Sequence, residues 1–239
     1  MSLRIQQLEN ETLLSWELSP TDLSCFWFDP EYWQQQQKVY AKKKGRADTW
    51  FFQHDRTKGV LRHYWRGGMI GKLLQDQYLY LGLGRTRVYQ EFTLLTHLHK
   101  KGLNVPFPIG AHVVKQGFVY RGDIITGAIP GAQSLLDILK IRRLSADELA
   151  KVADCIANFH QNGVYHADLN INNILISQYH TVYLIDFDRG MLKPPDPSWQ
   201  RQNIDRLHRS FTKEAGRNIE FHWQDDDWKR LLACYKSKM

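Results

Sequence analysis

The sequence predicts an α+β protein with two lobes, a small antiparallel sheet followed by a mainly helical half. Short strand-like apolar runs occur up to about residue 125, interrupted by one helical segment at 85–100. A cluster of glycine and proline at 127–131 follows, and the chain beyond it has helical periodicity. We therefore expect an N-terminal lobe at residues 1–126 and a C-terminal lobe at residues 127–239.

The composition excludes several classes of protein. The chain has 239 residues, of which 43% are hydrophobic and 24% charged, as in ordinary globular proteins with a sizeable core. No apolar run approaches the ~18 residues of a membrane-spanning helix, and the first ten residues lack the apolar core of a signal peptide. We therefore expect a cytoplasmic protein.

Cysteine content and net charge narrow the chemistry further. The three cysteines are odd in number and far apart, which favours neither a disulfide framework nor a zinc site and agrees with a reducing compartment. The net charge of +7 suits nucleic acid, an anionic membrane surface or an acidic substrate. Charge alone does not choose among these partners.

The elements of the N-terminal lobe follow from local patterns. Asp29 as N-cap and Pro30 in the first turn predict a short helix, and the segment 85–100 predicts the main one. Five runs predict strands: 13–16, 50–52, 60–64, 109–114 and 118–125.

The C-terminal lobe begins with the clearest helix of the chain. Ser145 and Glu148 form a capping-box pattern, and Gly163 is the residue expected just past the helix end, so a helix is expected at about 146–162. Its apolar residues recur at spacings of three and four. A polar loop at 166–173 follows, and then a hairpin of strands at 174–176 and 182–186.

The polar loop and the hairpin carry the residues that indicate chemistry. The loop contains His166, Asp168 and Asn173 in the pattern His-x-Asp-x-x-x-x-Asn, and Asp186-Phe187-Asp188 stands at the end of the second hairpin strand. Because a hairpin returns on itself, we expect Asp186 to lie beside the loop. Carboxylate and amide oxygens suit Mg²⁺, and phosphoryl transfer needs such a metal together with a carboxylate that orients the attacking hydroxyl.

With these motifs the sequence resembles the protein-kinase-like superfamily, and in particular the lipopolysaccharide kinases of the 3-deoxy-D-manno-octulosonic acid (Kdo) kinase family. The resemblance covers the chain from about residue 25 to residue 228. It is carried by the segments 165–170, 173–175 and 184–190, and upstream by 60–64, 66–68, 91–95 and 120–126. It implies a two-lobed protein-kinase-like fold.

The resemblance implies a role for each residue of the loop and hairpin. Asp168 matches the catalytic aspartate, which acts as general base or positions the acceptor hydroxyl. Asn173 and Asp186 match the magnesium-binding positions. His166 is expected to support the catalytic loop through a hydrogen bond rather than to move a proton. Asp188 replaces a glycine of the general kinase pattern, which leaves open whether it joins the metal ligands or braces Arg189.

The resemblance also implies nucleotide-binding residues in the N-terminal lobe. Gly45 would lie in the loop over the phosphates, and Glu91 matches the helix glutamate that pairs with a phosphate-binding cation. The strand that offers a lysine in kinases offers Arg62 here, and a guanidinium is a rigid fork that also holds phosphate oxygens. The missing lysine is the main departure from the kinase pattern.

The length of the chain is an independent indication of the acceptor. Only 53 residues follow Asp186, too few for the activation segment and helices with which a protein kinase grips a peptide. A sugar or lipid-linked hydroxyl is therefore the better acceptor.

The resemblance implies an ATP- and Mg²⁺-dependent kinase that phosphorylates a hydroxyl, the 4-hydroxyl in the family, of Kdo on Kdo-lipid A during lipopolysaccharide core synthesis. It implies a peripheral position on the anionic cytoplasmic face of the inner membrane. No nucleic acid and no protein partner are expected, and the positive charge is attributed to attraction for phosphate. Two alternatives stay open: a kinase for heptose, an aminoglycoside or another small sugar, and a pseudokinase that acts as a lipid-binding adaptor.

Overall fold

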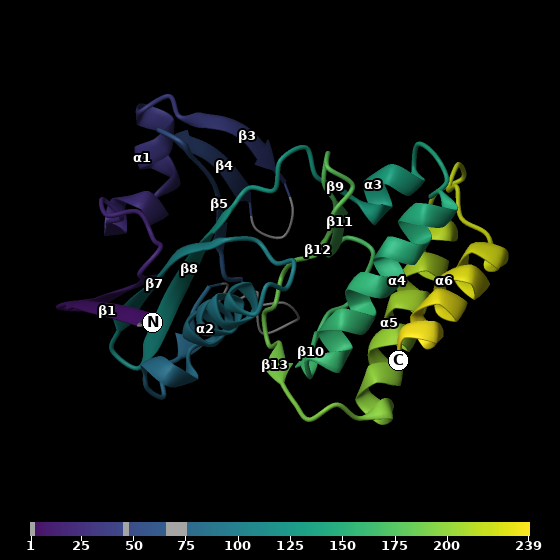
Figure 1. The fold of residues 1–239 in the computed structure, drawn as a ribbon. Helices are drawn as coiled ribbons and strands as arrows, with labels where there is room; N and C mark the ends of the chain where they lie inside the picture. The colour runs from purple at the N-terminus through teal and green to yellow at the C-terminus, as the bar shows by residue number, and fades with distance from the viewer. Residues whose placement is uncertain (1–2, 45–47, 66–75) are drawn as a thin grey trace. The chain divides into compact units, whose positions relative to one another are not determined.

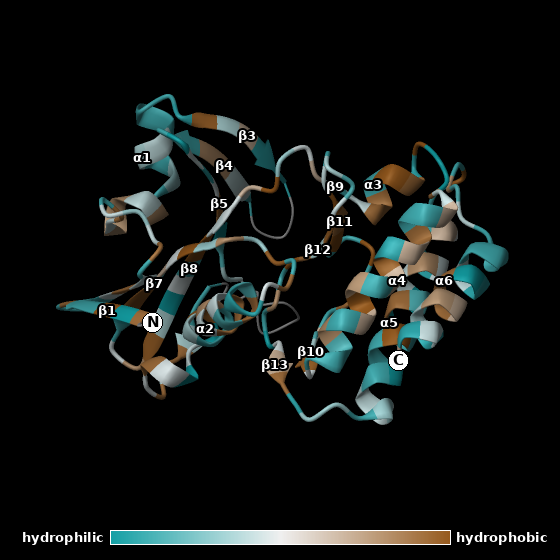
Figure 2. Ribbon diagram, in the orientation of Figure 1, coloured by the Kyte–Doolittle hydropathy of each residue, from teal (hydrophilic) through white to brown (hydrophobic). Residues whose placement is uncertain are grey.

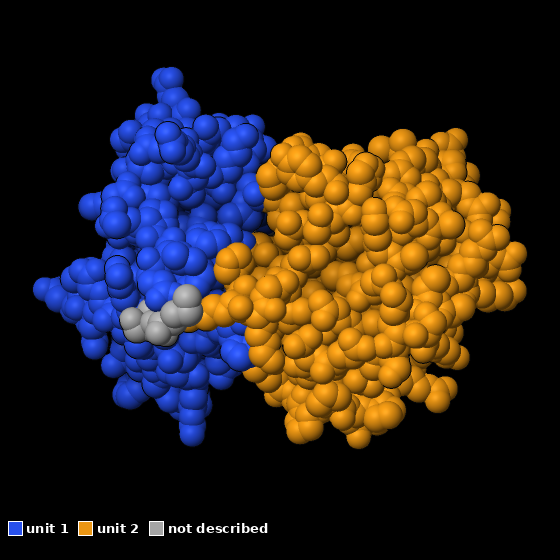
Figure 3. All heavy atoms as spheres, viewed as in Figure 1, with its two compact units in different colours: residues 1–97, 107–128 blue, residues 98–106, 129–239 orange. Residues whose placement is uncertain are grey.

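The computed structural model describes residues 3–44, 48–65 and 76–239. It has the expected α+β architecture, with an antiparallel sheet in the first part of the chain and most of the helices in the second (Figure 1). The chain forms two compact units, coloured separately in Figure 3. Unit 1 comprises residues 1–97 and 107–128, and unit 2 comprises residues 98–106 and 129–239.

Unit 2 therefore includes the segment 98–106, which the sequence-based division counted with the N-terminal lobe. The reason is local. Leu103 and Val105 are buried, and the backbone N–H of Leu184 donates to the carbonyl of Asn104 at 3.1 Å, which ties the segment to a strand of unit 2. Sequence composition does not reveal such a backbone contact.

Unit 1 is built on one antiparallel sheet with the strand order β1-β2-β7-β8-β5-β4-β3, and β6 pairs with β8. The strands are β1 (Leu3–Leu8), β2 (Glu11–Trp16), β3 (Val39–Lys43), β4 (Thr49–His54), β5 (Thr57–His63), β6 (Tyr78–Leu79), β7 (Pro108–Gln116) and β8 (Val119–Gly127). The five expected strands are confirmed as β2, β4, β5, β7 and β8. Edge strands β1 and β3 were not expected, because their mostly exposed residues give no buried apolar run.

The two faces of strand β5 explain how unit 1 positions its candidate residues. Leu61 belongs to a buried cluster with Trp27, Trp33 and Phe52, which come from or lie next to the short helices η1 (Cys25–Phe28) and α1 (Pro30–Gln35). Because side chains alternate along a strand, the next residue, Arg62, projects to the opposite face. That is the face with α2 (Arg87–Lys100), whose Glu91 meets Arg62.

The expected helices of unit 1 are present with small shifts. The Asp29 carboxylate accepts a hydrogen bond from the Glu31 N–H at 2.8 Å, and Pro30 opens α1, which confirms the N-cap prediction. The helix expected at 85–100 begins at Arg87, because the preceding residues form the 3₁₀ turn η3 (Leu83–Arg85).

Unit 2 is mainly helical, with α3 (Leu135–Leu139), α4 (Ala146–Gln161), α5 (Pro197–Ala215) and α6 (Asp225–Lys238). Its strands are short: β9 (Gln133–Ser134), β10 (Val164–Tyr165), β11 (Ile174–Ile176), β12 (Val182–Leu184) and β13 (Met191–Leu192). They form a sheet of order β12-β11-β9 and the pair β10-β13. Within the described ranges, no helix is both long and apolar enough to cross a membrane.

Helix α4 follows its sequence prediction closely. The Glu148 N–H donates to Ser145 Oγ at 3.1 Å and the Ser145 N–H donates to Glu148 Oε2 at 2.8 Å, which confirms the capping box. Gly163 follows the helix end at a φ of 71°, a conformation that favours glycine. Teal and brown alternate along α4 in Figure 2, as expected for an amphipathic helix.

The hairpin after the polar loop is also confirmed, with Ile174 paired to Leu184 and Ile176 to Val182. Its second strand ends at Leu184, two residues earlier than expected. Asp186 instead has a positive φ of 63° and begins an irregular segment. Helices α5 and α6 then fill most of the chain beyond it, where no element had been predicted.

Candidate active site

His166 lies at the start of the polar loop at 166–173, which is the candidate catalytic loop, and is buried. Its Nδ1 accepts a hydrogen bond from the Asp168 N–H at 3.1 Å, so Nε2 carries the proton and donates to the carbonyl of Ile185 at 2.9 Å. Burial lowers the pKa of His166, which favours this neutral form. The ring therefore ties the loop to the chain just before Asp186.

Asn173 ties the end of the loop to its middle. Its Nδ2 donates to the carbonyl of Asp168 at 2.9 Å, and its own carbonyl accepts from the Ile185 N–H at 3.0 Å. The side chain is largely buried. Because the amide nitrogen is engaged with a carbonyl, Oδ1 is the amide atom suited to a cation.

Asp186 follows Ile185, the residue that bonds to both His166 and Asn173. The hairpin thus returns Asp186 to the loop, as the sequence spacing predicted. The next residue, Phe187, is fully buried, stacks on Phe159 with ring centroids 5.8 Å apart and lies 4.8 Å from the His166 ring. This anchor sets the backbone on which Asp186 is presented.

Helix α5 holds the same loop from a distant part of the sequence. Asn203 Oδ1 accepts from the His166 N–H at 3.2 Å, and its Nδ2 donates to the His166 carbonyl at 3.1 Å. Arg206 donates from Nε to Asp168 Oδ1 at 2.9 Å and also from Nη2. Ser210 Oγ accepts from the Ile171 N–H at 3.2 Å.

Sequence analysis missed these three residues of α5. They lie 37 to 39 positions from their partners, so no motif joins them to the loop. Their spacing of three and four places Asn203, Arg206 and Ser210 on one face of a helix. A predicted helix at 197–215 would have revealed that polar face, although not its partner.

The candidate nucleotide-binding residues of unit 1 form a separate group. Arg62 Nη2 donates to Glu91 Oε1, and the Tyr64 hydroxyl donates to Glu91 Oε2. The Glu91 side chain is 1% exposed and that of Arg62 is 28% exposed. The predicted cation and the predicted glutamate are therefore paired.

Gly45, the third predicted nucleotide-binding residue, lies outside the described residues. The chain on either side of it belongs to the antiparallel hairpin of β3 and β4. There, Lys42 forms an ion pair with Asp48 at 2.5 Å and lies over the Trp50 ring at 4.0 Å.

Two other features of unit 1 involve none of the predicted site residues. Cys25, Glu11 and His112 lie close together, with His112 Nε2 3.0 Å from Glu11 Oε2. Burial, together with Glu11, raises the pKa of Cys25 to about 11, so the thiol stays protonated.

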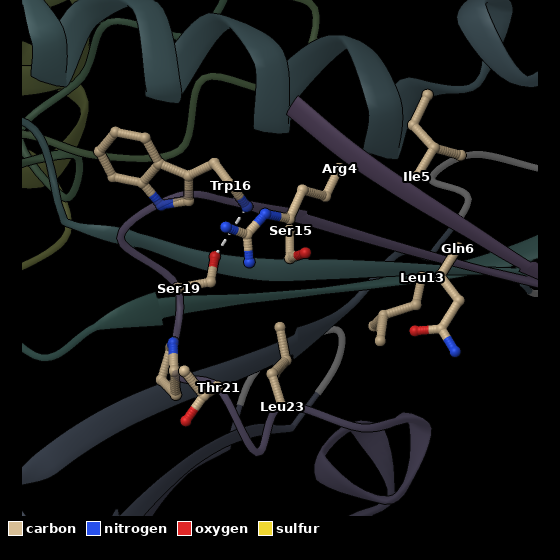
Figure 4. A pocket seen from close by; sticks show the side chains of 10 residues that line it. Arg4, Ile5, Gln6, Leu13, Ser15, Trp16, Ser19, Thr21 and Leu23 are labelled. Carbon is tan, nitrogen blue, oxygen red and sulfur yellow. Dashed lines mark hydrogen bonds between the residues drawn. The ribbon is translucent and has the colours of Figure 1, made fainter. Parts of the chain in front are cut away.

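A pocket of about 270 Å³ lies beside β1 and β2 (Figure 4). At this pocket the backbone N–H of Trp16 donates a hydrogen bond to Ser19 Oγ at 2.9 Å.

Similarity to known proteins identifies the family of the chain. The model of the lipopolysaccharide kinase (Kdo/WaaP) family matches residues 30–235. The chain belongs to this family. It is therefore a member of a kinase family with a protein-kinase-like fold.

Three relatives illustrate the similarity, and each is named 3-deoxy-D-manno-octulosonic acid kinase. The protein from Vibrio cholerae is 46% identical over 187 residues, which cover 78% of this chain and 79% of the relative. The protein from Vibrio parahaemolyticus is 42% identical over 239 residues, or 98% and 100% of the two chains. The protein from Actinobacillus succinogenes is 38% identical over 242 residues, with the same coverage.

Proposed function

We propose that this lipopolysaccharide kinase transfers the γ-phosphoryl group of ATP to a hydroxyl of a 3-deoxy-D-manno-octulosonic acid residue on a lipid A acceptor. The acceptor follows from the relatives, which carry the name of that sugar-acid kinase over most of this chain. The observation that supports the proposal is the braced loop of unit 2, in which Asn173 bonds to Asp168 and the residue before Asp186 bonds to both His166 and Asn173.

Asp168 is the residue proposed to act on the acceptor hydroxyl. Its backbone is held on both sides, by His166 at the N–H and by Asn173 at the carbonyl. Its side chain is 48% exposed, so an acceptor has access to it. A carboxylate held in this way orients the hydroxyl and takes its proton as the oxygen attacks phosphorus.

The donor set of the loop fits magnesium. Asn173 presents an amide oxygen and Asp186 a carboxylate, and oxygen ligands of this kind are those that Mg²⁺ prefers. These two residues would hold the ion, which would offset charge on the phosphate oxygens.

We assign the 4-hydroxyl of the Kdo residue as the acceptor atom from the family resemblance.

Arg62 is the residue of unit 1 that we propose for phosphate binding. Its guanidinium bonds to Glu91 and lies 5.3 Å from the Tyr64 ring centroid, and part of its side chain is exposed. Replacement of Arg62 by Ala is then expected to raise the Michaelis constant for ATP, and an unchanged constant would assign the phosphates to another cation.

Mass spectrometry of the product tests the function directly. After incubation with ATP, Mg²⁺ and Kdo-bearing lipid A, we expect the acceptor to gain one phosphoryl group located on the Kdo residue. Phosphate on a heptose or on lipid A itself would point to a different acceptor. An acceptor of unchanged mass, with no ATP consumed, would favour the adaptor.

We also propose that the protein acts as a peripheral protein on the anionic cytoplasmic face of the inner membrane. The net charge of +7 and the exposed lysines at the end of β3 support an electrostatic attachment. Binding to anionic vesicles should then weaken as salt rises, since screening of exposed charges acts beyond ~8 Å at physiological ionic strength. Binding to neutral vesicles serves as the control, and salt-insensitive binding contradicts the electrostatic attachment.

A further inference from the structure

Helix α5 contacts the catalytic loop at three successive points of one face. Asn203 and Ser210 bond to backbone atoms of the loop, whereas Arg206, between them, bonds to the side chain of Asp168. Asn203 is buried, and the helix is anchored below it by the buried Leu207 and Phe211. The backbone from which Arg206 projects is thus held in place.

The two hydrogen bonds that Arg206 donates go to the same carboxylate oxygen of Asp168. Both Nε and Nη2 donate to Oδ1 of Asp168, and within the described ranges no donor contacts Oδ2. Oδ2 therefore remains able to accept the proton of an acceptor hydroxyl. Arg206 itself uses two of the five N–H bonds of a guanidinium on Asp168 and keeps the donors of Nη1 for another acceptor.

Arg206 is not needed to hold Asp168 in place. The Asp168 backbone is already fixed by His166 at its N–H and by Asn170 and Asn173 at its carbonyl. The side chains of Arg206 and Asp168 are 46% and 48% exposed, and an ion pair of that exposure contributes little to folding. The arginine is thus placed for a ligand rather than for stability.

We propose that Arg206 binds the carboxylate of the acidic sugar whose hydroxyl is presented to Asp168. This inference rests on the proposed function, since the acceptor named for the relatives is a sugar acid. A guanidinium holds a carboxylate by paired hydrogen bonds of fixed geometry, which lysine does not reproduce. In this arrangement one edge of the Arg206 guanidinium bonds to Asp168 and another edge bonds to the acceptor carboxylate. The positive charge of the guanidinium then lies between two carboxylates that otherwise repel each other. Arg206 forms and breaks no covalent bond in this role.

The test compares two acceptors, Kdo-bearing lipid A with the free Kdo carboxylate and the same acceptor with that carboxylate converted to the carboxamide. Wild-type protein should prefer the acid in kcat/KM by roughly 10- to 100-fold, the range of a charge-assisted hydrogen bond. Arg206→Gln should raise KM for the acid by a similar factor and leave kcat/KM for the carboxamide within about threefold. Arg206→Lys should be intermediate, because it keeps the charge without the fork.

Arg201→Gln is the matched control, since it removes the same charge from the same helix at an 84% exposed side chain. It should behave as wild type on both acceptors, and urea unfolding should confirm that every variant is folded. A loss of kcat in Arg206→Gln that is equal on both acceptors overturns the inference and assigns the arginine to Asp168 or to the transferred phosphoryl group. Wild-type protein that uses both acceptors equally well overturns the inference alone, whereas wild-type protein that phosphorylates neither overturns the proposed function.

Discussion

Among the described residues, Arg62–Glu91 in unit 1 and Arg206–Asp168 in unit 2 are arginine–carboxylate pairs of candidate site residues, and their surroundings differ. In unit 1, Arg62 meets Glu91, whose side chain is 1% exposed and also accepts from the Tyr64 hydroxyl. In unit 2, Arg206 meets Asp168, and both side chains are about half exposed. The first pair thus has a buried carboxylate and a partly exposed arginine, whereas in the second pair both side chains are exposed to solvent.

The difference in burial assigns different physical roles to the two pairs. A buried carboxylate is costly unless it is paired and hydrogen-bonded, so the Glu91 pair must persist in the folded protein. A half-exposed pair contributes about 0–1 kcal/mol and is easily rearranged when a ligand arrives. We therefore expect changes at Glu91 to affect folding, and changes at Asp168 to affect catalysis alone.

Asp168→Asn gives the largest expected effect. The amide does not accept the proton of the acceptor hydroxyl, so the rate of phosphoryl transfer should fall by at least ~10²-fold. The free energy of unfolding should stay within about 0.5 kcal/mol of wild type, as for other exposed substitutions. Transfer of labelled phosphate from ATP and urea unfolding measure the two quantities. Turnover at the wild-type rate would remove Asp168 from the mechanism.

Glu91→Gln tests the other side of the comparison. It removes the charge that holds Arg62, and we expect the free energy of unfolding to fall by about 1–3 kcal/mol, the cost of poorly satisfied buried polar groups. The Michaelis constant for ATP should rise as well, because Arg62 loses its orientation. Both quantities follow from urea unfolding and from initial rates at varied ATP.

Asp48→Asn is the matched control for Glu91→Gln. It breaks the Lys42–Asp48 ion pair of the same unit, in which the side chains are 33% and 41% exposed. A change within about 0.5 kcal/mol is expected there. If both variants lose the same stability, burial does not distinguish the pairs.

The geometry of the candidate catalytic loop was predictable because its residues are close in sequence. His166, Asp168 and Asn173 share one loop, and a hairpin of ordinary length returns Asp186 to it. The prediction needed only the motif and the geometry of a hairpin. The same holds for the N-cap at Asp29 and for the capping box at Ser145, where the cause is contained within four residues.

The contacts of α5 were not predictable, because they join residues far apart in sequence. Nothing near Asp168 indicates that Arg206 will meet it, and nothing near Asn104 indicates a bond to Leu184. Such contacts depend on how helices and strands pack. The pairing of Arg62 with Glu91 was foreseen from the family resemblance, since the sequence itself does not show which face of β5 meets α2.

His160 is a buried titratable residue that packs against helix α5. It lies in α4, its Nδ1 is 2.7 Å from the Tyr235 hydroxyl, and its ring packs edge-on against Trp199 of α5. Burial lowers its pKa from 6.5 to about 4, although Asn203 opposes the shift. The histidine therefore joins three helices, α4, α5 and α6, in its neutral form.

We also expect this junction to be sensitive to acid. Because the pKa of His160 is lower in the folded than in the unfolded protein, its contribution to stability is complete above about pH 6.5 and is lost progressively as the pH falls towards 4. At pH 5 the loss amounts to about 2 kcal/mol. Urea unfolding at pH 7.5 and pH 5 should show this loss in wild type and in the exposed control His222→Gln, and a smaller one in His160→Gln. If His160→Gln loses as much stability between pH 7.5 and pH 5 as wild type does, the acid sensitivity arises at another group. The packing of α4, α5 and α6 then does not depend on a neutral His160.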